Sequence, residues 1–178
     1  MEIRFVQVGE LQCNCYLLEK EQQCLLIDPG DEYEKIQKFI QGKKILAILL
    51  THSHFDHIGC VKRLVKEYQI PVYHKDNLNE GKHKISIFDF EVIYTFGHTM
   101  DSITYYFKEE KAMFTGDFLF FRTIGRCDFL ESDYSAMLDS IEKIKKYNDD
   151  VIVYPGHGST TVLGDEKKYN HYFNNNRK

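Results

Sequence analysis

The sequence predicts an α/β fold with a layered architecture. Short apolar runs of strand length alternate with segments whose apolar residues recur at helical spacing, and they do so in both halves of the chain. One run, Ile45 to Leu50, is apolar throughout, as expected for a strand buried on both faces in the centre of its sheet. The 178 residues contain no repeat or Gly/Ser-rich linker, so we expect a single domain over residues 1–178.

The first half of the chain begins with β-type runs and turns. Strands are predicted at residues 3–8, 16–19 and 24–27, and the last of these ends in the turn Asp28-Pro29-Gly30. A helix is predicted over 31–41, followed by a stop at Gly42 and the buried strand 44–50. Apolar residues at helical spacing predict an amphipathic helix over 58–68, and a short strand follows at 70–73.

The second half repeats this alternation. The polar stretch 74–84 predicts an exposed connection, and strands are expected at 85–96, 102–107 and 112–115. Residues 134–147 place four apolar side chains on one face of a helix, and a last strand is predicted at 151–154. Strands and helices therefore interleave along the whole chain.

Composition excludes several classes of partner. The net charge is −4 and basic residues are spread along the chain, which gives no electrostatic footprint for nucleic acid. No apolar run approaches the roughly 20 residues of a membrane span, and the opening MEIRFVQVGE does not resemble a signal peptide. Five cysteines without a CxxC pair favour reduced thiols and a cytoplasmic protein. We expect a small-molecule substrate, and the sequence is silent on oligomeric state.

Histidine and carboxylate side chains gather where predicted strands end. The stretch THSHFDHIGC, residues 51 to 60, follows the buried strand and holds three histidines and one aspartate. Three further donors, His98, Asp117 and His157, follow later strands, each beside a glycine. In open α/β sheets, ligand sites gather at the carboxyl ends of strands, so these side chains are expected to converge.

The converging set predicts a metal site. Its seven donors are His52, His54, Asp56, His57, His98, Asp117 and His157. Imidazole with carboxylate suits zinc, iron or manganese, and seven donors suit two ions that share a bridging carboxylate. A solvated polar loop is the other explanation, and we apply it to His74, His83 and His171. For the cluster it fails, because gathered imidazoles are hard to satisfy without a metal.

The same motifs resemble the metallo-β-lactamase-fold superfamily. Its signature THxHxDHxG stands at residues 51–59, and Gly97-His98-Thr99, Gly116-Asp117 and Pro155-Gly156-His157-Gly158 follow in order. Within that superfamily the chain is most similar to the small glyoxalase II-like hydrolases, through further matches at 14–17, 27–30, 116–128 and 163–166. The resemblance implies a four-layer αββα sandwich with the metals at one edge.

The resemblance also implies how the ligands divide. One metal ion falls to His52, His54 and His98, the other to Asp56, His57 and His157, and Asp117 bridges them. The cofactors implied are two divalent ions, Zn²⁺ in the first place, with iron or manganese as alternatives.

Departures from the family pattern bear on the substrate. Met100 and Asp101 stand where relatives show Pro and Gly, and Gly158-Ser159 stands where glyoxalase II has a tyrosine after its last metal histidine. Arg126 falls where larger relatives have a base that contacts the substrate. Either Arg126 binds substrate here, or it is a structural arginine under the edge of the sheet.

The function implied is hydrolysis of acyl thioesters such as S-lactoylglutathione. A water activated between two cations would attack the carbonyl carbon, with Asp56 as the catalytic residue that orients it. The main alternative is a mononuclear iron persulfide dioxygenase that uses His52 or His54 together with His98 and Asp117. A metal-binding or regulatory module would bind metal without turnover. Metal content with assays of thiol release and oxygen consumption would separate the three.

Overall fold

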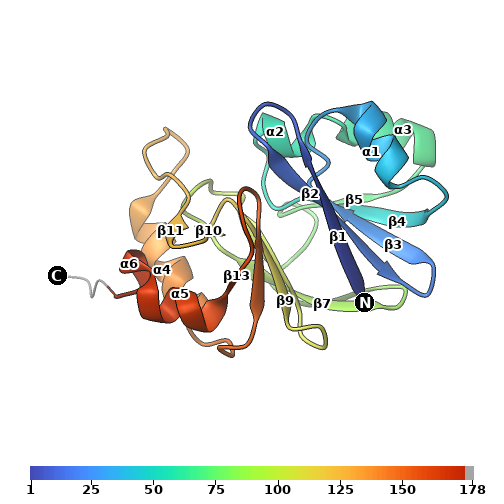
Figure 1. Ribbon diagram of the computed structural model, residues 1–178. Coiled ribbons are helices and arrows are strands. Elements are labelled where there is room, and N and C mark those ends of the chain that lie inside the picture. The colour runs from blue at the N-terminus through green and yellow to red at the C-terminus, as the bar shows by residue number, and fades with distance from the viewer. Residues whose placement is uncertain (175–178) are drawn as a thin grey trace.

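Two stacked β-sheets form the centre of the molecule (Figure 1), described here by a computed structural model for residues 1–174. In spatial order, the first sheet consists of β1 (Glu2–Val8), β2 (Cys13–Lys20), β3 (Gln23–Ile27), β4 (Lys44–Leu49) and β5 (Val72–Tyr73). The second sheet consists of β13 (Thr161–Val162), β12 (Ile152–Pro155), β9 (Ala112–Gly116), β8 (Ile103–Phe107), β7 (Phe88–Tyr94) and β6 (Gly81–Ile85). A separate hairpin pairs β10 (Leu119–Phe120) with β11 (Thr123–Ile124).

Helices cover the outer face of each sheet. The first sheet carries α1 (Tyr33–Phe39), α2 (Phe55–Ile58) and α3 (Val61–Tyr68), and the second carries α4 (Tyr134–Ile144), α5 (Leu163–Tyr169) and α6 (His171–Asn174). Within residues 1–174, none of the helices is long and apolar enough to cross a membrane. The order helix, sheet, sheet, helix confirms the αββα sandwich.

Three apolar clusters hold the four layers together. The central cluster lies between the sheets, where Leu25 and Leu49 of the first sheet meet Phe90 and Phe114 of the second. A second cluster packs Ile36 and Leu64 of the helices against the first sheet, and a third packs α4 against the second sheet. A central strand such as β4 therefore buries both of its faces, which explains why it is apolar from Ile45 to Leu49.

Parallel strand pairs set the position of the site. β3 lies parallel to β4, and β9 lies parallel to β12. The carboxyl ends of each pair therefore lie at the same edge of their sheet, and the loops that leave them carry Asp28, residues 51–57, Asp117 and His157. The strands hold these loops rigidly because their own side chains are buried in the clusters between the layers.

The structure corrects two sequence-based boundaries. The strand expected over 85–96 is a hairpin, β6 and β7, that turns at Ser86 with a φ of 54°, so part of the expected connection 74–84 is a strand. Alternating lysines conceal β6 because it is an edge strand with little apolar surface. The helix expected from residue 58 is broken before Val61, because the backbone N–H of Cys60 donates to the Pro29 carbonyl instead of continuing the helix.

Several short elements were not predicted from the sequence, namely β10, β11, β13, α5 and α6. Glu166 of α5 links four of them, because its buried carboxylate accepts hydrogen bonds from Arg122, Thr161 and Asn170. These contacts tie the C-terminal helices to the hairpin that follows Asp117.

Candidate metal centre

All seven donors predicted from the sequence come together at one edge of the sandwich. The loop after β4 supplies His52 and His54, and α2 supplies Asp56 and His57. The remaining three, His98, Asp117 and His157, follow β7, β9 and β12. The other histidines assigned to solvent lie elsewhere: His83 is on edge strand β6, His171 begins α6, and His74 follows β5.

The first group of donors consists of His52, His54 and His98. Nε2 of His98 lies 3.0 Å from Nδ1 of His54, and the ring centroids of His52 and His54 are 4.7 Å apart. Nε2 of His52 is buried and has no hydrogen-bond partner within residues 1–174. A buried nitrogen without a partner costs free energy, unless a cation takes its lone pair.

The second group consists of Asp56, His57 and His157. Nε2 of His57 lies 3.3 Å from Nε2 of His157, which lies 3.2 Å from a carboxylate oxygen of Asp56. Two imidazole nitrogens that face each other beside a carboxylate form a pocket for positive charge.

Asp117 lies between the two groups. One of its oxygens is 3.3 Å from Nε2 of His57, and the other is 3.7 Å from Nε2 of His98 and 3.5 Å from Nε2 of His157. Its Oδ1 is buried without a hydrogen-bond partner in the described part of the chain. One carboxylate that reaches both groups is the arrangement needed for a bridging ligand.

Hydrogen bonds on the outer nitrogens fix the direction of the lone pairs. Nδ1 of His57 faces Asp28 at 2.9 Å, Nδ1 of His98 faces the Arg126 carbonyl at 2.9 Å, and Nδ1 of His157 faces the Leu11 carbonyl at 2.9 Å. Each partner is an acceptor, so the outer nitrogen donates and the inner nitrogen keeps its lone pair.

The remaining two histidines follow the same rule. Nδ1 of His52 lies 3.1 Å from Oγ1 of Thr51, which donates its own proton to Asp28 at 2.6 Å. Nε2 of His54 lies 3.3 Å from the Glu131 carboxylate, which leaves Nδ1 directed at His98. All five imidazoles therefore present a lone pair to the centre, as a set of metal ligands requires.

The electrostatics of the site favour bound cations. Burial lowers the pKa of His52 and of His98, so both are neutral at pH 7. Burial acts to raise the pKa of Asp117, but the surrounding histidines, His57 foremost, hold it well below its ordinary value. The pKa of His57 is raised despite its burial, chiefly by the Asp28 carboxylate. The ionised Asp117 carboxylate attracts cations, and the neutral His52 and His98 imidazoles suit divalent metal ions.

Glycine leaves room for the ligands at two close contacts. A Cβ on Gly156 would lie 2.3 Å from Oδ1 of Asp117 and 2.7 Å from the His57 ring. A Cβ on Gly30 would lie 1.6 Å from the Asp56 carbonyl. Any larger residue at these positions would displace a donor, which explains the glycines in the two motifs.

Cys13 lies near the second group but behind the His57 ring. Its Sγ is 3.6 Å from Nδ1 of His57, the nitrogen that is already bonded to Asp28. Burial raises the pKa of the Cys13 thiol to about 11, so the thiol is protonated beside the His57 ring. The donor set is therefore histidine and carboxylate, and it fits two divalent ions.

A cavity of about 520 Å³ opens onto the donors. Its walls include the apolar side chains Leu11, Phe55, Phe120 and Phe129, together with Arg126. We refer to it as the metal pocket. Arg126 is exposed at its mouth, bonded through two nitrogens to Asp128 at 2.9 Å and placed over the Phe129 ring at 4.5 Å. Arg126 therefore lies at the surface and not under the sheet edge, and its contact with substrate stays a prediction.

Comparison with known families agrees with this geometry. The family model for the metallo-beta-lactamase superfamily matches residues 8–82 and 76–157. The chain belongs to this superfamily. The matched residues include all seven donors, and membership places the chain in a superfamily of metallo-hydrolases.

Two bacterial relatives match along nearly their whole lengths. The probable metallo-hydrolase YqgX of Bacillus subtilis is 35% identical, over 98% of each chain. The hydroxyacylglutathione hydrolase GloC of Haemophilus influenzae is 32% identical, over 98% of this chain and 99% of its own.

Solved structures give the same fold. BLEG-1 B3 metallo-beta-lactamase superposes with a TM-score of 0.93 at 31% identity, over 98% of this chain and all of that one. A di-iron-bound form of TTHA1623 superposes with a TM-score of 0.87 at 34% identity, over 95% and 99% of the two chains. ETHE1 from Myxococcus xanthus superposes with a TM-score of 0.86 at 30% identity, over 96% and 84%.

The structure adds residues that the motif spacing did not reveal as part of the site. Asp28 was interpreted as a turn residue within a family match and given no role at the site, yet it is buried and bonds both Thr51 and His57. Its φ of 49° is unusual for a residue other than glycine and is a feature typical of functional sites. Glu131 had no sequence signal, because it reaches His54 across 77 positions.

Proposed function

We propose that this protein is a binuclear metal-dependent hydrolase of acyl thioesters. The observation that carries the proposal is the complete donor set, in which five imidazole lone pairs and the Asp56 and Asp117 carboxylates converge. The similarity to a hydroxyacylglutathione hydrolase over 98% of the chain supports a thioester as the substrate class. S-lactoylglutathione is one member of that class.

Residues around the centre would hold two ions, Zn²⁺ in the first place, with iron or manganese as alternatives. His52, His54 and His98 would hold one, Asp56, His57 and His157 the other, and Asp117 both. When bound, the ions supply Lewis acidity and lower the pKa of a water toward neutrality. A relative in a di-iron-bound form supports iron as an alternative occupant.

The protein's own groups direct the reaction. Asp56 is ionised, since the neighbouring His157 imidazole lowers its pKa against the effect of burial, and it orients the attacking water and accepts its proton. The water oxygen forms a bond to the carbonyl carbon, the carbon–sulfur bond breaks, and the sulfur leaves with the electron pair. A thiolate leaves readily because thiols have a pKa of roughly 8.5.

A panel of acyl thioesters, followed by thiol release, tests this function. We expect turnover that depends on about two bound metal ions per chain, measured by elemental analysis of the same preparation. Binding of both metals with no turnover of any thioester would reject the proposal and favour a metal-binding module.

Arg126 offers a test of the carrier thiol. Replacement of Arg126 with Ala should raise the KM of thioesters with an anionic carrier and leave the KM of neutral ones unchanged. The increase should be only about two- to fivefold, because an exposed ion pair contributes little. Asp128→Ala should lower the KM of thioesters with an anionic carrier, since Asp128 neutralises the guanidinium by accepting from Nε and Nη2 of Arg126. Equal KM values for both classes of carrier in all three proteins would show that Arg126 does not contact substrate.

A persulfide dioxygenase is the second candidate. The structural similarity to ETHE1 favours it, and His52 or His54 with His98 and Asp117 would hold a single iron. The completeness of the second group, Asp56, His57 and His157, favours the hydrolase. One iron per chain with oxygen consumption on a persulfide, and no thiol release, would identify the dioxygenase.

We also propose that the protein acts in the cytoplasm. All five cysteines are free thiols in the structure, as expected for a reducing compartment. Fractionation of cells that produce the protein would test this location.

A further inference from the structure

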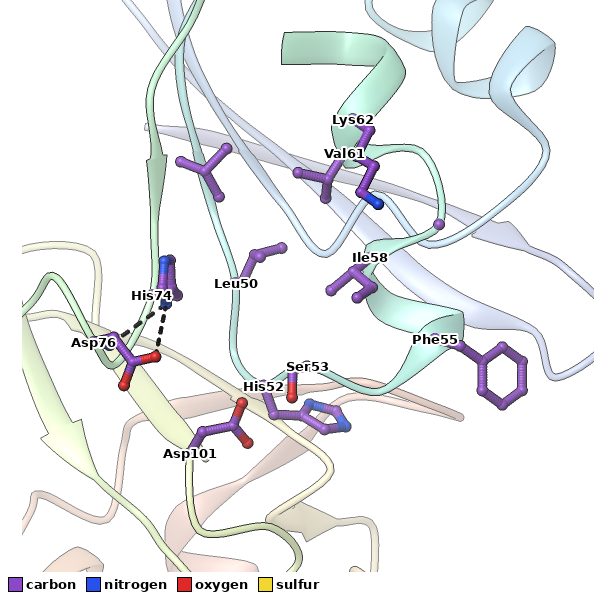
Figure 2. Close-up of a pocket in the computed structure, with 12 residues that line it drawn as sticks. Leu50, His52, Ser53, Phe55, Ile58, Val61, Lys62, His74, Asp76 and Asp101 are labelled. Carbon is purple, nitrogen blue, oxygen red and sulfur yellow. Dashed lines mark hydrogen bonds and ion pairs between the residues drawn. The ribbon is translucent and has the colours of Figure 1, made fainter.

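A second hollow lies beside the metal pocket, between α3 and β5 (Figure 2). Its volume is about 590 Å³, within the range typical of small-molecule sites. We call it the α3–β5 groove and define it by its lining residues, Leu50, His52, Ser53, Phe55, Ile58, Gly59, Val61, Lys62, Val72, His74, Asp76 and Asp101.

The walls of the groove are apolar. Leu50, just after β4, lies on one side, and Ile58 and Val61 of the helices lie on the other (Figure 2). Val72 of β5 also lines the groove. Ile58, Val61 and Val72 are only partly buried against the core of their layer, so they leave apolar surface open to the groove. An apolar hollow of this size is a site for an aliphatic group.

Three charged side chains line the groove, and one of them, Asp76, is paired with His74 beside β5 (Figure 2). Lys62, which belongs to α3, lies at one end of the groove, and no ion pair joins it to any acid in residues 1–174. Asp101 lies at the opposite end, near Ser53 and His52, as Figure 2 shows. A bound molecule with an anionic end would therefore place that end at Lys62 and keep it away from Asp101.

The groove adjoins the metal centre. His52 lines the groove and also directs its unpartnered Nε2 to the first group of donors. Phe55 lines both the groove and the metal pocket, so the two hollows meet at that side chain. A substrate held by its carbonyl at the metal centre can extend from there into the groove.

We propose that the α3–β5 groove binds the aliphatic acyl chain of the substrate and prefers a chain whose far end carries a carboxylate, paired with Lys62. This proposal rests on the thioester hydrolase function. The carrier thiol is then left to the metal pocket, where Arg126 and the aromatic side chains lie. Asp101 lies at the end of the groove beside His52, so its negative charge disfavours a carboxylate there and favours the chain's far end at Lys62.

Direct binding of product acids tests the groove without any turnover. The zinc-loaded protein is titrated with octanoate and with octanedioate while the methyl NMR signals of Val61 and Val72 are followed. We expect both acids to shift these signals, and octanedioate to bind about two- to fivefold more tightly, as for an exposed ion pair. Shifts confined to Leu11 in the metal pocket would overturn the proposal.

Matched lysine variants identify the anchor. Lys62→Ala should remove the preference for octanedioate, whereas Lys66→Ala, one turn further along the exposed face of α3, should keep it. Val72→Phe should fill the groove and weaken both acids by about tenfold or more, because an aliphatic chain of this length buries several methylene groups. Circular dichroism confirms that each variant is folded. A preference that survives Lys62→Ala would refute the anchor.

Kinetics then separate this proposal from the hydrolase function. Among acyl thioesters with one carrier, kcat/KM should rise with chain length in the wild type and stay level in Val72→Phe, while the acetyl thioester is cleaved equally by both proteins. No cleavage of any thioester would reject the proposed function. Cleavage of all chain lengths with equal efficiency in both proteins would reject the groove alone.

Discussion

At the scale of single residues, the outer contacts of the histidines decide what the site can hold. Each of the five imidazoles of the site has an acceptor on its outer nitrogen, and these acceptors include two carboxylates, Asp28 and Glu131. Such outer contacts fix the ring and raise the basicity of the inner nitrogen. Each candidate histidine ligand therefore depends on a second residue that holds its ring in place.

Replacement of Asp117 with Asn tests the bridge. A neutral amide cannot neutralise two cations, so we expect the variant to lose about one metal ion per chain and most of its thioesterase activity. Elemental analysis and thiol release measure the two effects. His83→Ala is the control, because His83 bonds the Asn79 carbonyl on edge strand β6. Full metal content and rate in Asp117→Asn would remove the two-metal assignment.

Glu131 provides a finer test. Because it accepts from Nε2 of His54 at 3.3 Å, Glu131→Ala should weaken metal binding by about tenfold, measured by competition with a chelator. Glu131→Gln keeps an acceptor oxygen and should recover part of the loss. If Glu131→Ala and wild type bind the metal equally, the contact does not orient His54.

At the scale of elements, short segments anchored by buried polar contacts hold the site loops in place. The hairpin β10–β11 follows Asp117 directly, and it is tied to α5 by Glu166. Glu166 is fully buried and paired with the Arg122 guanidinium at 2.8 Å, so its carboxylate is satisfied on all sides. The C-terminal helices therefore support the metal pocket from behind.

Removal of the Glu166 carboxylate should destabilise the fold. Glu166→Ala leaves Arg122, Thr161 and Asn170 without their acceptor, and leaving the buried Thr161 and Asn170 unsatisfied costs about 1–3 kcal/mol. Asp165→Ala is the matched control, since Asp165 is exposed and lies 3.7 Å from Arg122, and it should cost less than about 0.5 kcal/mol. Urea unfolding compares the variants. Equal losses in both would contradict the assigned role of Glu166.

At the scale of the whole molecule, the metal ions would join the two halves of the sandwich. Donors His52, His54, Asp56 and His57 belong to the first sheet's layer, and His98, Asp117 and His157 belong to the second. Each group of donors contains members from both halves. Bound ions would therefore link layers that are otherwise held by the central apolar cluster.

Chelation should lower the melting temperature. Ions that bind the native state alone stabilise it by about 2.7 kcal/mol at a hundredfold excess over Kd, which for a chain of this size corresponds to roughly 5–10 °C. Calorimetry before and after removal of metal measures the change, and Asp117→Asn should show a smaller one. An unchanged Tm would mean that the donors do not couple the two halves.

Sequence alone determined the layered α/β class and the seven donors, and the resemblance of its motifs to a known family implied the αββα order. The class and the donors rest on local patterns, namely apolar runs of strand length and histidines placed where those runs end, and such patterns are visible in one dimension. Tertiary structure alone decided the short elements β6, β10 and β13, the contacts of Asp28 and Glu131 with their histidines, and the α3–β5 groove. These features join segments far apart in the chain, as Glu131 and His54 show, and no spacing rule encodes them. Their positions follow from how the two sheets pack, because packing determines which distant side chains become neighbours.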